Sequence, residues 1–443
     1  MTALEPAYGR AGRSVGVIHF GLGAFHRGHQ AVYFDEAMRN QLGEWGIYGV
    51  SPRSSQVSGS LRKQNFCYTV NARSGKEQNP TVVASIFDGG LFERSNPELQ
   101  RAVLSPELKL ITVTVTEKAY VAGVESESMP NRILDLLTTR YRAGLAAPTV
   151  ISCDNLPNNG EFLRNVLLDS ANARSFDNDL MRWIEEIQLP NSMVDRIVPA
   201  ITEEAINQFE KDFGYRDESL ISTEPFRQWV VEPHPAPYDL TTLGIEVTSD
   251  VESFEQLKLR LFNGAHSATA YFSQLAGYEF VYQAMAIPEW NSYIEKLQEQ
   301  LAKSFSAPSS MDVVEYSQTA RARIGNSALA HRSAQIAMDG SAKLPQRLFR
   351  ALNTLGEKGR PRECVSFAVA LWIRFLQSGL AVADPLLDQL LARTSGESAL
   401  DVLSSIMRCP GLRSPVSESE WQNIATFVDE LRVHSPIEIA RTL

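Results

Sequence analysis

Four polar side chains in one short stretch, residues 254–267, have the types that proton transfer requires. They are an acid, an amine, an amide and an imidazole: Glu255, Lys258, Asn263 and His266. The stretch contains no proline, and its apolar residues recur at helical spacing, which predicts an α-helix. At about 100° per residue, Glu255, His266 and Asn263 fall at about 60°, 80° and 140° from Lys258. The four side chains are therefore expected on one arc of that helix.

This set of side chains could oxidise a secondary alcohol. The reaction needs a base for the hydroxyl proton and donors for the oxyanion that forms as hydride leaves. Lys258 can be the base if its pKa falls from about 10.4 towards about 7–8. Asn263 can donate to the oxyanion, His266 can orient the substrate, and Glu255 can pass the proton to water. The alternative is a solvated polar face with Lys258 and Glu255 as a weak i,i+3 pair.

The chain is long enough to place such a site between domains. It has 443 residues, 44% of them hydrophobic, and a net charge of −10 without long runs of one sign. We therefore expect no nucleic-acid partner and no membrane partner. No apolar run reaches the length of about 18 residues that a membrane span needs, and no signal peptide is recognisable.

Cysteine and histidine spacing favours a cytoplasmic protein without a metal site. The four cysteines are scattered and form no CxxC pair: Cys67, Cys153, Cys364 and Cys409. This pattern is typical of buried thiols in a reducing compartment rather than of disulfides or structural zinc. His26 and His29 are three residues apart, but no cysteine or carboxylate cluster accompanies them as further ligands.

A glycine turn near the N-terminus is typical of a dinucleotide-binding fold. A short apolar strand is predicted over residues 14–20 and a helix over residues 29–40, with a Gly-Leu-Gly turn after the strand. Gly21 would permit the tight turn, and Gly23 would let the backbone approach a pyrophosphate. The third glycine of the usual motif is displaced by two residues. A glycine turn that only packs is the alternative.

Strands and helices then alternate, which predicts a doubly wound α/β domain. Strands are expected over residues 45–50, 66–70, 81–87, 108–115 and 149–153, and a helix over residues 131–143. Two further stretches, 190–197 and 224–230, are interpreted as strand edges with polar tips. The pattern becomes helical from about residue 249 onwards. We therefore predict a Rossmann-type domain over residues 1–248 and a mainly α-helical domain over residues 249–443.

Polar residues follow three of these strands, at the edge where such folds bind ligands. The second strand ends in a Ser-Pro-Arg-Ser tip that carries Arg53 and lacks the acid that would favour NAD, so the cofactor is expected to be NAD with NADP left open. The run over 108–115 leads into Thr116 and Glu117. The strand over 149–153 leads into an Asp-Asn-x-Pro run, which either presents amides or serves only as a turn.

The chain resembles the polyol-specific long-chain dehydrogenases, the family of mannitol 2-dehydrogenase and fructuronate reductase. The resemblance covers nearly the whole length and rests on several motifs in the same order. They are Gly-x-Gly-x-Phe-His-Arg at 21–27, Thr-Glu-Lys at 116–118, Ser-Cys-Asp-Asn-x-Pro-x-Asn-Gly at 152–160, Met-Val-Asp-Arg-Ile at 193–197, Glu-Pro-Phe-Arg-Gln-Trp at 224–229, Lys-Leu-Arg-Leu-x-Asn-Gly-x-His-Ser at 258–267 and Asp-Gly-Ser-x-Lys at 339–343. Together they favour the catalytic interpretation of residues 254–267.

The resemblance implies a metal-independent enzyme whose active site lies in the cleft between the two domains. It implies Lys258 as general base, Asn155 and Asn263 as oxyanion donors, His266 as the substrate-orienting group and Glu255 as proton relay. The candidate cofactor-binding residues are Gly21, Gly23, Ala24, Phe25, His26, Arg27, Arg53, Thr116 and Glu117.

Three further positions are expected at the substrate. Asp195 and Lys343 match positions that the resemblance implies for binding substrate hydroxyls. Gln335 stands where some members carry an arginine near the substrate, so the far end of the substrate could differ here.

We therefore expect a cytoplasmic NAD(P)-dependent oxidoreductase that interconverts a sugar alcohol and a 2-ketose, with D-mannitol and D-fructose as the favoured pair. Reduction of D-fructuronate to D-mannonate is the alternative, with Lys343 or Arg196 as the cation that an acid substrate needs. Phosphorylated polyols are a weaker option. A dinucleotide-binding sensor without turnover would be expected to lose Lys258 or an oxyanion amide, and all are present. The sequence leaves monomer and dimer open.

Overall fold

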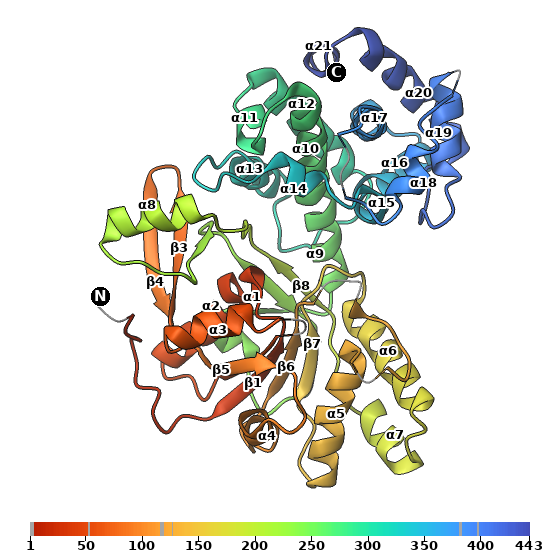
Figure 1. Ribbon diagram of the computed structural model, residues 1–443. Helices are drawn as coiled ribbons and strands as arrows, with labels where there is room; N and C mark the ends of the chain where they lie inside the picture. The colour runs from red at the N-terminus through yellow and green to blue at the C-terminus, as the bar shows by residue number, and fades with distance from the viewer. Residues whose placement is uncertain (1–3, 52–53, 116–118, 126, 381–382, 397) are drawn as a thin grey trace. The chain divides into compact units, whose positions relative to one another are not determined.

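The computed structural model describes residues 4–51, 54–115, 119–125, 127–380, 383–396 and 398–443. The chain folds as two compact units, residues 1–252 and residues 253–443. The first unit is built on a parallel sheet and the second is mainly helical (Figure 1). The predicted fold class, a Rossmann-type domain followed by a helical domain, is confirmed.

A five-stranded sheet forms the centre of the first unit. Its order is β5-β2-β1-β6-β7, and all its neighbouring strands are parallel. The strands are Val15–Phe20 (β1), Gly46–Ser51 (β2), Ile86–Leu91 (β5), Leu110–Val113 (β6) and Thr149–Ser152 (β7). The chain passes from β1 outwards to β2 and later returns to β6 on the other side of β1. The carboxyl ends of β1 and β6 therefore flank the crevice in which such sheets bind ligands.

Both faces of this sheet are covered, which explains the nearly continuous apolar runs of its strands. Val17 and Ile47 belong to the core on one face, together with α2 (Gln30–Arg39). Their neighbours Ile18 and Tyr48 belong to the core on the opposite face. That second core also contains α4 (Pro97–Val103), α5 (Met129–Arg142), α6 (Asn159–Ala173) and α7 (Asn178–Glu185).

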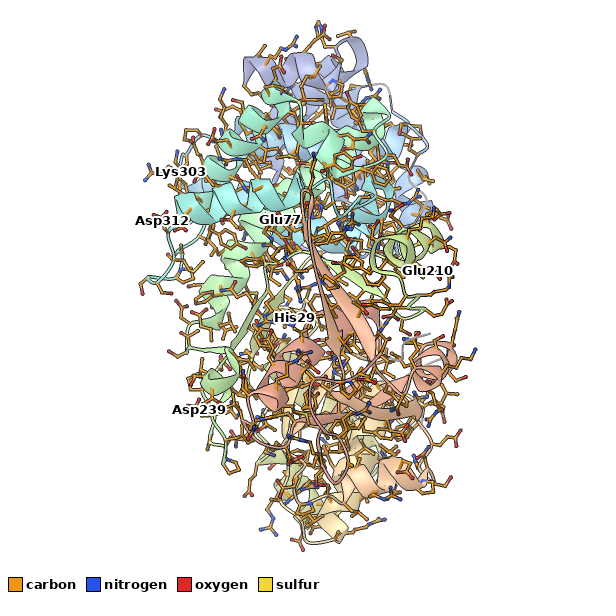
Figure 2. The ribbon with its side chains drawn as sticks, turned by 90° about the vertical axis from the view of Figure 1, so that its left-hand side faces the viewer. His29, Glu77, Glu210, Asp239, Lys303 and Asp312 are labelled. Atoms are coloured by element: carbon orange, nitrogen blue, oxygen red, sulfur yellow. The ribbon has the colours of Figure 1, made fainter. Side chains whose placement is uncertain are left out.

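A short additional helix lies between the glycine turn and the helix predicted over residues 29–40. α1 (Ala24–Gly28) starts directly after the turn, and α2 follows it after a break at His29, where φ is −126° and ψ is −88°. The helix predicted over residues 29–40 is confirmed as α2, whereas α1 was not predicted. The His29 ring is buried inside the first unit, where Nε2 lies 2.9 Å from the Gln228 carbonyl oxygen (Figure 2).

Two three-stranded sheets are added to the first unit. One joins the antiparallel pair β3 (Tyr68–Ser74) and β4 (Glu77–Val83) to β9 (Ile221–Thr223), with Glu77 at the hairpin tip (Figure 2). The other contains β8 (Ser192–Asp195), β10 (Gln228–Val231) and β11 (Glu246–Val247). The expected strand over 81–87 was wrong as one strand, because it combines the end of β4 with the start of β5.

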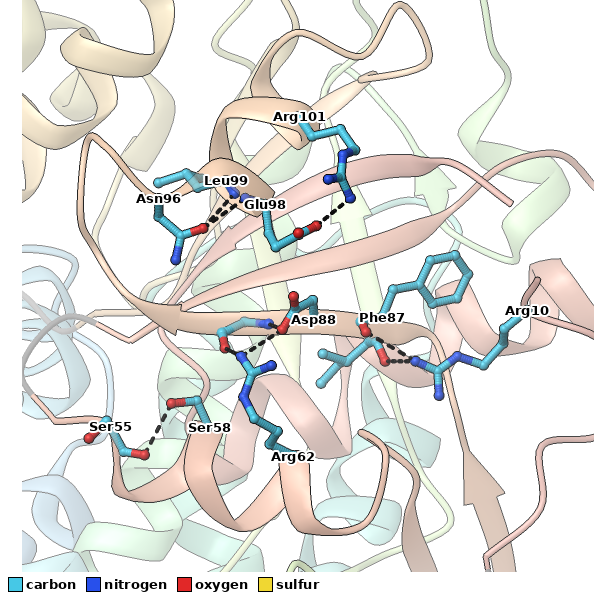
Figure 3. Close-up of polar contacts among 12 residues, drawn as sticks. Arg10, Ser55, Ser58, Arg62, Phe87, Asp88, Asn96, Glu98, Leu99 and Arg101 are labelled. Atoms are coloured by element: carbon cyan, nitrogen blue, oxygen red, sulfur yellow. Dashed lines mark hydrogen bonds and ion pairs between the residues drawn. The ribbon is translucent and has the colours of Figure 1, made fainter. Parts of the chain in front are cut away.

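Short polar contacts fix the helices that flank the edge strand β5. Arg62 of α3 (Gln56–Lys63) donates to the Asp88 carboxylate and to the Gly89 carbonyl, both at 2.8 Å (Figure 3). Asn96 caps α4 by accepting from the N–H groups of Glu98 and Leu99 (Figure 3). Such a cap satisfies donors that the first turn of a helix leaves unpaired.

The second unit is a layered set of helices. They include α9 (Val251–Leu257, which crosses the unit boundary), α10 (Ala265–Ala276), α11 (Val281–Met285), α12 (Pro288–Ala302), α13 (Val313–Ile324), α14 (Ser333–Ala337), α15 (Gly340–Leu344), α16 (Arg350–Glu357), α17 (Glu363–Gln377), α18 (Leu387–Leu391), α19 (Ala399–Met407), α20 (Glu418–Val433) and α21 (Pro436–Thr442). Two π-helical segments interrupt this series, η3 (Lys258–Gly264) and η4 (Pro345–Phe349), and they pack against each other. The remaining described helices are α8 (Glu203–Phe213) and the 3₁₀ turn η2 (Leu240–Leu243), both in the first unit.

Candidate functional site

A cavity of about 540 Å³ opens at the carboxyl edge of the parallel sheet in the first unit. The turn after β1 contributes Gly21, Leu22 and Gly23 to its wall, the end of β2 contributes Ser51, and Thr114 follows β6. These are the central strand and its two neighbours, so the cavity occupies the switch point of the sheet. An open α/β sheet binds its ligand at this place.

The two glycines of the turn differ in what a larger residue would meet at their positions. Gly21 has a φ of +107°, and a Cβ there would lie 2.1 Å from the Thr114 carbonyl oxygen. Gly23 has an ordinary φ of −65°, and a Cβ there would meet no described atom within 4 Å. Gly21 therefore serves the fold, whereas the open space at Gly23 belongs to the cavity. This geometry fits a pyrophosphate that approaches the backbone.

His26 and Arg27 of the same motif are directed into the protein. His26 is completely buried and its ring stacks on His19 at a centroid distance of 3.3 Å. Burial, reinforced by His19, lowers the pKa of His26 well below its usual value. The Arg27 guanidinium donates to the Ser219 carbonyl at 2.7 Å. Neither side chain lines the described part of the cavity, and a cofactor-binding role for them stays a prediction.

The remaining cofactor-binding candidates are only partly described. Ala24 and Phe25 are half-buried on α1. Arg53, Thr116 and Glu117 lie outside the described residues. Their roles stay predictions.

The cavity also contains polar residues that sequence reasoning did not select. They are Ser51, Ser54, Thr114, Glu125, Ser128 and Arg132. Ser51 ends β2, Ser54 comes shortly after it and Thr114 follows β6, a position at the sheet edge that could have identified these three. Arg132 lies on α5, pairs with Glu127 at 2.6 Å, and gave no signal in the sequence.

The loop after β7 is held by Asn159. Its amide nitrogen donates to the carbonyls of Ser152, Asp154 and Ser192, and its oxygen accepts from the Ser192 N–H at 2.9 Å. Asn159 is completely buried and joins the end of β7 to the start of β8. The turn interpretation of this motif therefore holds for Asn159.

The other polar residues of this loop differ in their surroundings. The Asp154 carboxylate accepts from the Val115 N–H at 3.0 Å and from the Tyr120 hydroxyl at 2.7 Å, which ties the loop to the chain after β6. Asn155 follows it and is exposed at the tip. The hydrogen bonds of Asp154 and Asn159 hold the backbone on both sides of Asn155. They therefore fix the position from which the Asn155 side chain projects.

Asp195 and Arg196 follow one another at the end of β8, and both are buried. Asp195 pairs in register with Gln228 of β10. The guanidinium of Arg196 uses all three of its nitrogens on backbone carbonyls, those of Gly28 and Glu224. Arg196 therefore holds two segments together and is a poor choice as the cation for an acid substrate.

In the second unit, the stretch that carries Lys258 and Asn263 is a π-helix rather than a regular α-helix. α9 ends at Leu257, η3 spans Lys258–Gly264, and α10 continues from Ala265. The predicted uninterrupted α-helix was therefore wrong in this turn. In a π-helix each N–H bonds to the carbonyl five residues earlier, so residues five apart become neighbours along the axis. Lys258 and Asn263 have this spacing.

The four candidate residues of this stretch are all buried. The exposed fractions are 8% for Glu255, 6% for Lys258, 7% for Asn263 and 6% for His266. A solvated polar face would be exposed, so that interpretation of the stretch was wrong.

His266 lies among cationic groups. Its ring contacts the His331 ring at a centroid distance of 5.1 Å. Burial is the main cause that lowers the pKa of His266 well below its usual value. The neighbouring side chains of His331, Arg347, Arg323 and Lys343 lower it further. The neutral ring leaves Nε2 without a hydrogen-bond partner among the described residues. Such a nitrogen can accept one hydrogen bond from a bound molecule or donate one to it.

Lys343 and Gln335 lie on neighbouring short helices. The Lys343 ammonium donates to the Met338 carbonyl at 2.7 Å, which closes the turn between α14 and α15. Asp339 in this turn has a φ of +56°, and its backbone N–H donates to the Ala383 carbonyl at 2.9 Å. Gln335 is exposed on α14. Substrate roles for Lys343 and Gln335 stay predictions.

Within the described residues, no group of three or more His, Cys, Asp or Glu side chains is arranged to hold a metal ion. None of the described helices is long and apolar enough to cross a membrane.

Comparison with known families gives two consecutive matches. The model of the mannitol dehydrogenase Rossmann domain matches residues 15–241, and the model of the mannitol dehydrogenase C-terminal domain matches residues 250–406.

Individual proteins are similar over nearly the whole chain. D-mannonate oxidoreductase of Escherichia coli (strain K12) is 33% identical, with 89% of this chain and 88% of that protein covered. Mannitol 2-dehydrogenase of Aspergillus fumigatus is 32% identical, with coverages of 90% and 87%. The solved structure of Pseudomonas fluorescens mannitol 2-dehydrogenase with NAD and D-mannitol has a TM-score of 0.87 at 28% identity, with coverages of 99% and 95%.

Proposed function

The chain belongs to the mannitol dehydrogenase family and is an oxidoreductase, and from this premise we propose that it interconverts a sugar alcohol and a 2-ketose with NAD. D-mannitol and D-fructose are the favoured pair. The observation that carries the proposal is the buried π turn η3, which holds an amine and an amide five residues apart, shortly before the neutral His266.

The cavity of the first unit is the proposed dinucleotide site. Gly21 permits the tight turn, Gly23 would let the backbone approach the pyrophosphate, and Ser51 and Arg132 line the same cavity. NAD, when bound, supplies the acceptor for the hydride. The structures of related proteins support NAD, because mannitol 2-dehydrogenase of Pseudomonas fluorescens was solved with it.

The chemical roles follow from the types of side chain. Lys258 takes the hydroxyl proton during oxidation, because it is the buried amine of the π turn. Asn155 and Asn263 donate amide N–H groups to the oxyanion as it forms. In the reverse direction, protonated Lys258 returns the proton to the alkoxide. Glu255, one helical turn before Lys258, relays the proton to water.

The other candidates orient the substrate. His266 holds a substrate hydroxyl through the nitrogen that has no partner among the described residues. Asp195 and Lys343 bind further hydroxyls of the sugar chain, as their positions in the family motifs imply. A polyol offers several hydroxyls, so fixing more than one of them selects which carbon reacts.

A second candidate function is reduction of an acid, D-fructuronate to D-mannonate, and the cations beside His266 favour it. The Arg323 guanidinium lies 4.0 Å from the centroid of the Phe262 ring, and Arg347 donates to the Ser267 hydroxyl at 2.9 Å. Both arginines therefore contact neighbours of His266, since Ser267 follows it in the chain and the Phe262 ring lies against its ring. Their field would attract a carboxylate. The similarity to the Escherichia coli D-mannonate oxidoreductase points the same way.

Initial rates distinguish these functions. NADH and NADPH are each tested against D-fructose and D-fructuronate, with a chelator present throughout. Turnover of fructose with NADH is expected. Turnover of fructuronate alone would select the second candidate, and faster rates with NADPH would overturn the preference for NAD. No turnover of either sugar, with NADH still raising the melting temperature, would overturn both and leave a dinucleotide-binding protein without this catalysis.

A further inference from the structure

Gln298 of α12 donates a side-chain hydrogen bond to the backbone of the π turn η3. π-Helical turns are rare and occur mostly as single turns inside α-helices, often at functional sites. Gln298 is 1% exposed, and its amide nitrogen donates to the Leu261 carbonyl at 2.8 Å. Leu261 lies between Lys258 and Asn263 in the same turn. The contact therefore fixes the backbone segment from which both candidate catalytic side chains project.

The orientation of the Gln298 amide is fixed by a second contact. Its oxygen accepts from the Arg321 guanidinium of α13 at 2.7 Å, and another Arg321 nitrogen pairs with Glu295 at 2.7 Å. A guanidinium can only donate and a carbonyl can only accept. The amide therefore has one orientation in which both of its ends are hydrogen-bonded. In a flipped amide, the nitrogen would face the Arg321 donor and the oxygen would face the Leu261 carbonyl.

This chain of contacts runs from the surface to the π turn. Glu295 and Arg321 lie on the neighbouring helices α12 and α13, whose ends at Lys303 and Asp312 are marked in Figure 2. The side chain of Glu295 is 52% exposed and that of Arg321 13% exposed. The outer residues orient the amide, and the amide holds the Leu261 carbonyl.

We propose that Gln298 is a positioning residue for catalysis, which acts by holding the Leu261 carbonyl and with it the π-helical spacing of Lys258 and Asn263. The inference rests on the proposed function, because it assigns Gln298 through the roles of those two residues. Gln298 itself touches the backbone of the turn and no reacting group. A small displacement of catalytic groups is enough to slow a reaction by about two orders of magnitude.

The test compares Gln298→Met with Gln300→Met, after turnover of the wild type has been established. Gln300 lies on the same helix and also uses both ends of its amide, but on residues of α17 rather than of η3: its nitrogen donates to Glu363 and its oxygen accepts from the Cys364 N–H. Gln298→Met is expected to lower kcat by about 10- to 100-fold with KM and NADH affinity preserved. Gln300→Met should lower the melting temperature similarly and leave kcat unchanged.

Gln298→Glu sharpens the result, because it keeps the size of the side chain and the contact to Arg321 but replaces the donor with an oxygen. Its kcat should fall as in Gln298→Met. If Gln298→Met does not fold, Arg321→Met tests the same chain of contacts, and a fall in kcat without a change in KM is expected.

Normal kcat in folded Gln298→Met and Gln298→Glu would overturn the inference while leaving the proposed function intact. An equal loss of kcat in Gln300→Met would show a general effect of α12 and would also overturn it. A wild type without ketose turnover would overturn the proposed function itself.

Discussion

Burial determines the protonation state of the candidate imidazole. His266 has a pKa well below its usual value because it is removed from water and faces His331 and three cationic side chains. It is therefore neutral near pH 7, where an unperturbed histidine would be partly charged. A neutral ring can hold a substrate hydroxyl without repelling the ammonium form of Lys258.

At the same scale, replacement of Lys258 by alanine tests the general base. Lys258→Ala should reduce ketose turnover by about 10²- to 10⁴-fold, because no other amine occupies the π turn. NADH affinity should be preserved, since the proposed cofactor cavity is lined by residues of the first unit. Steady-state kinetics and NADH fluorescence titration provide the measurements. Lys303→Ala, at the exposed end of α12, is the control, and near-normal turnover in Lys258→Ala would remove Lys258 from this role.

Two elements depart from regular geometry at the proposed site, the glycine turn after β1 and the π turn η3. In the first, Gly21 adopts a φ of +107° against the Thr114 carbonyl, while Gly23 faces open space in the cavity. In the second, hydrogen bonds shift to five-residue spacing. In each case the backbone adopts an uncommon conformation beside residues that are proposed to bind the cofactor or to catalyse the reaction.

The two glycines of the turn should respond in opposite ways to alanine. Gly21→Ala should destabilise the protein by about 2 kcal/mol or more, because its Cβ would clash with the Thr114 carbonyl and its φ is unfavourable. Gly23→Ala should leave stability within about 0.5 kcal/mol and weaken NADH binding by about tenfold. Urea unfolding and NADH titration separate the two effects.

Gly59→Ala is the matched control for these variants. Gly59 lies in α3, and a Cβ there would meet no described atom within 4 Å. This change should preserve NADH binding and stabilise the helix by up to about 1 kcal/mol. Unchanged NADH affinity in Gly23→Ala would contradict the assignment of the cavity.

Across the whole molecule, five histidines are held with lowered pKa values. Burial is the leading cause in each case: the pKa of His19 and of His29 falls to about 3, that of His331 to about 4, and those of His26 and His266 fall well below the usual value. Both units contain such residues. Unfolding exposes these rings to water, where each has a pKa near 6.5.

Acidification should therefore destabilise the protein. Below about pH 6.5 the unfolded chain binds more protons than the folded chain, so the free energy of unfolding falls as the pH is lowered towards 4. Each histidine contributes a slope of up to about 1.4 kcal/mol per pH unit. Urea unfolding at a series of pH values measures this slope. His331→Gln should reduce it, whereas His434→Gln, at an exposed position, should not, and a flat profile would contradict the assignment of neutral buried rings.

Much of the architecture could be predicted from the sequence, because local patterns were sufficient. Continuous apolar runs indicated the parallel strands, the Gly-Leu-Gly turn indicated the switch point, and the change of period near residue 249 indicated a helical second half. These features depend on neighbours in the chain, which the sequence displays directly. The expected strands over 66–70 and 81–87 cover only parts of β3 and β4, and the pairing of β3 with β9 was not predicted because β9 lies far away in the sequence.

The types of candidate residue were also visible in the sequence, but their states were decided by tertiary structure. Lys258, Asn263 and His266 are buried because distant helices pack over them, and the turn that carries them became π-helical where α12 supplies the Gln298 amide. Separate packing within the first unit directed His26, Arg27 and Arg196 into the interior, although their motifs suggested ligands. The sequence by itself thus determined the fold class and which chemical groups are present. Only the tertiary structure decided which of these side chains are used up in hydrogen bonds to the backbone and which remain in position to react. The reason is that burial and hydrogen-bond pairing depend on contacts between residues far apart in the chain.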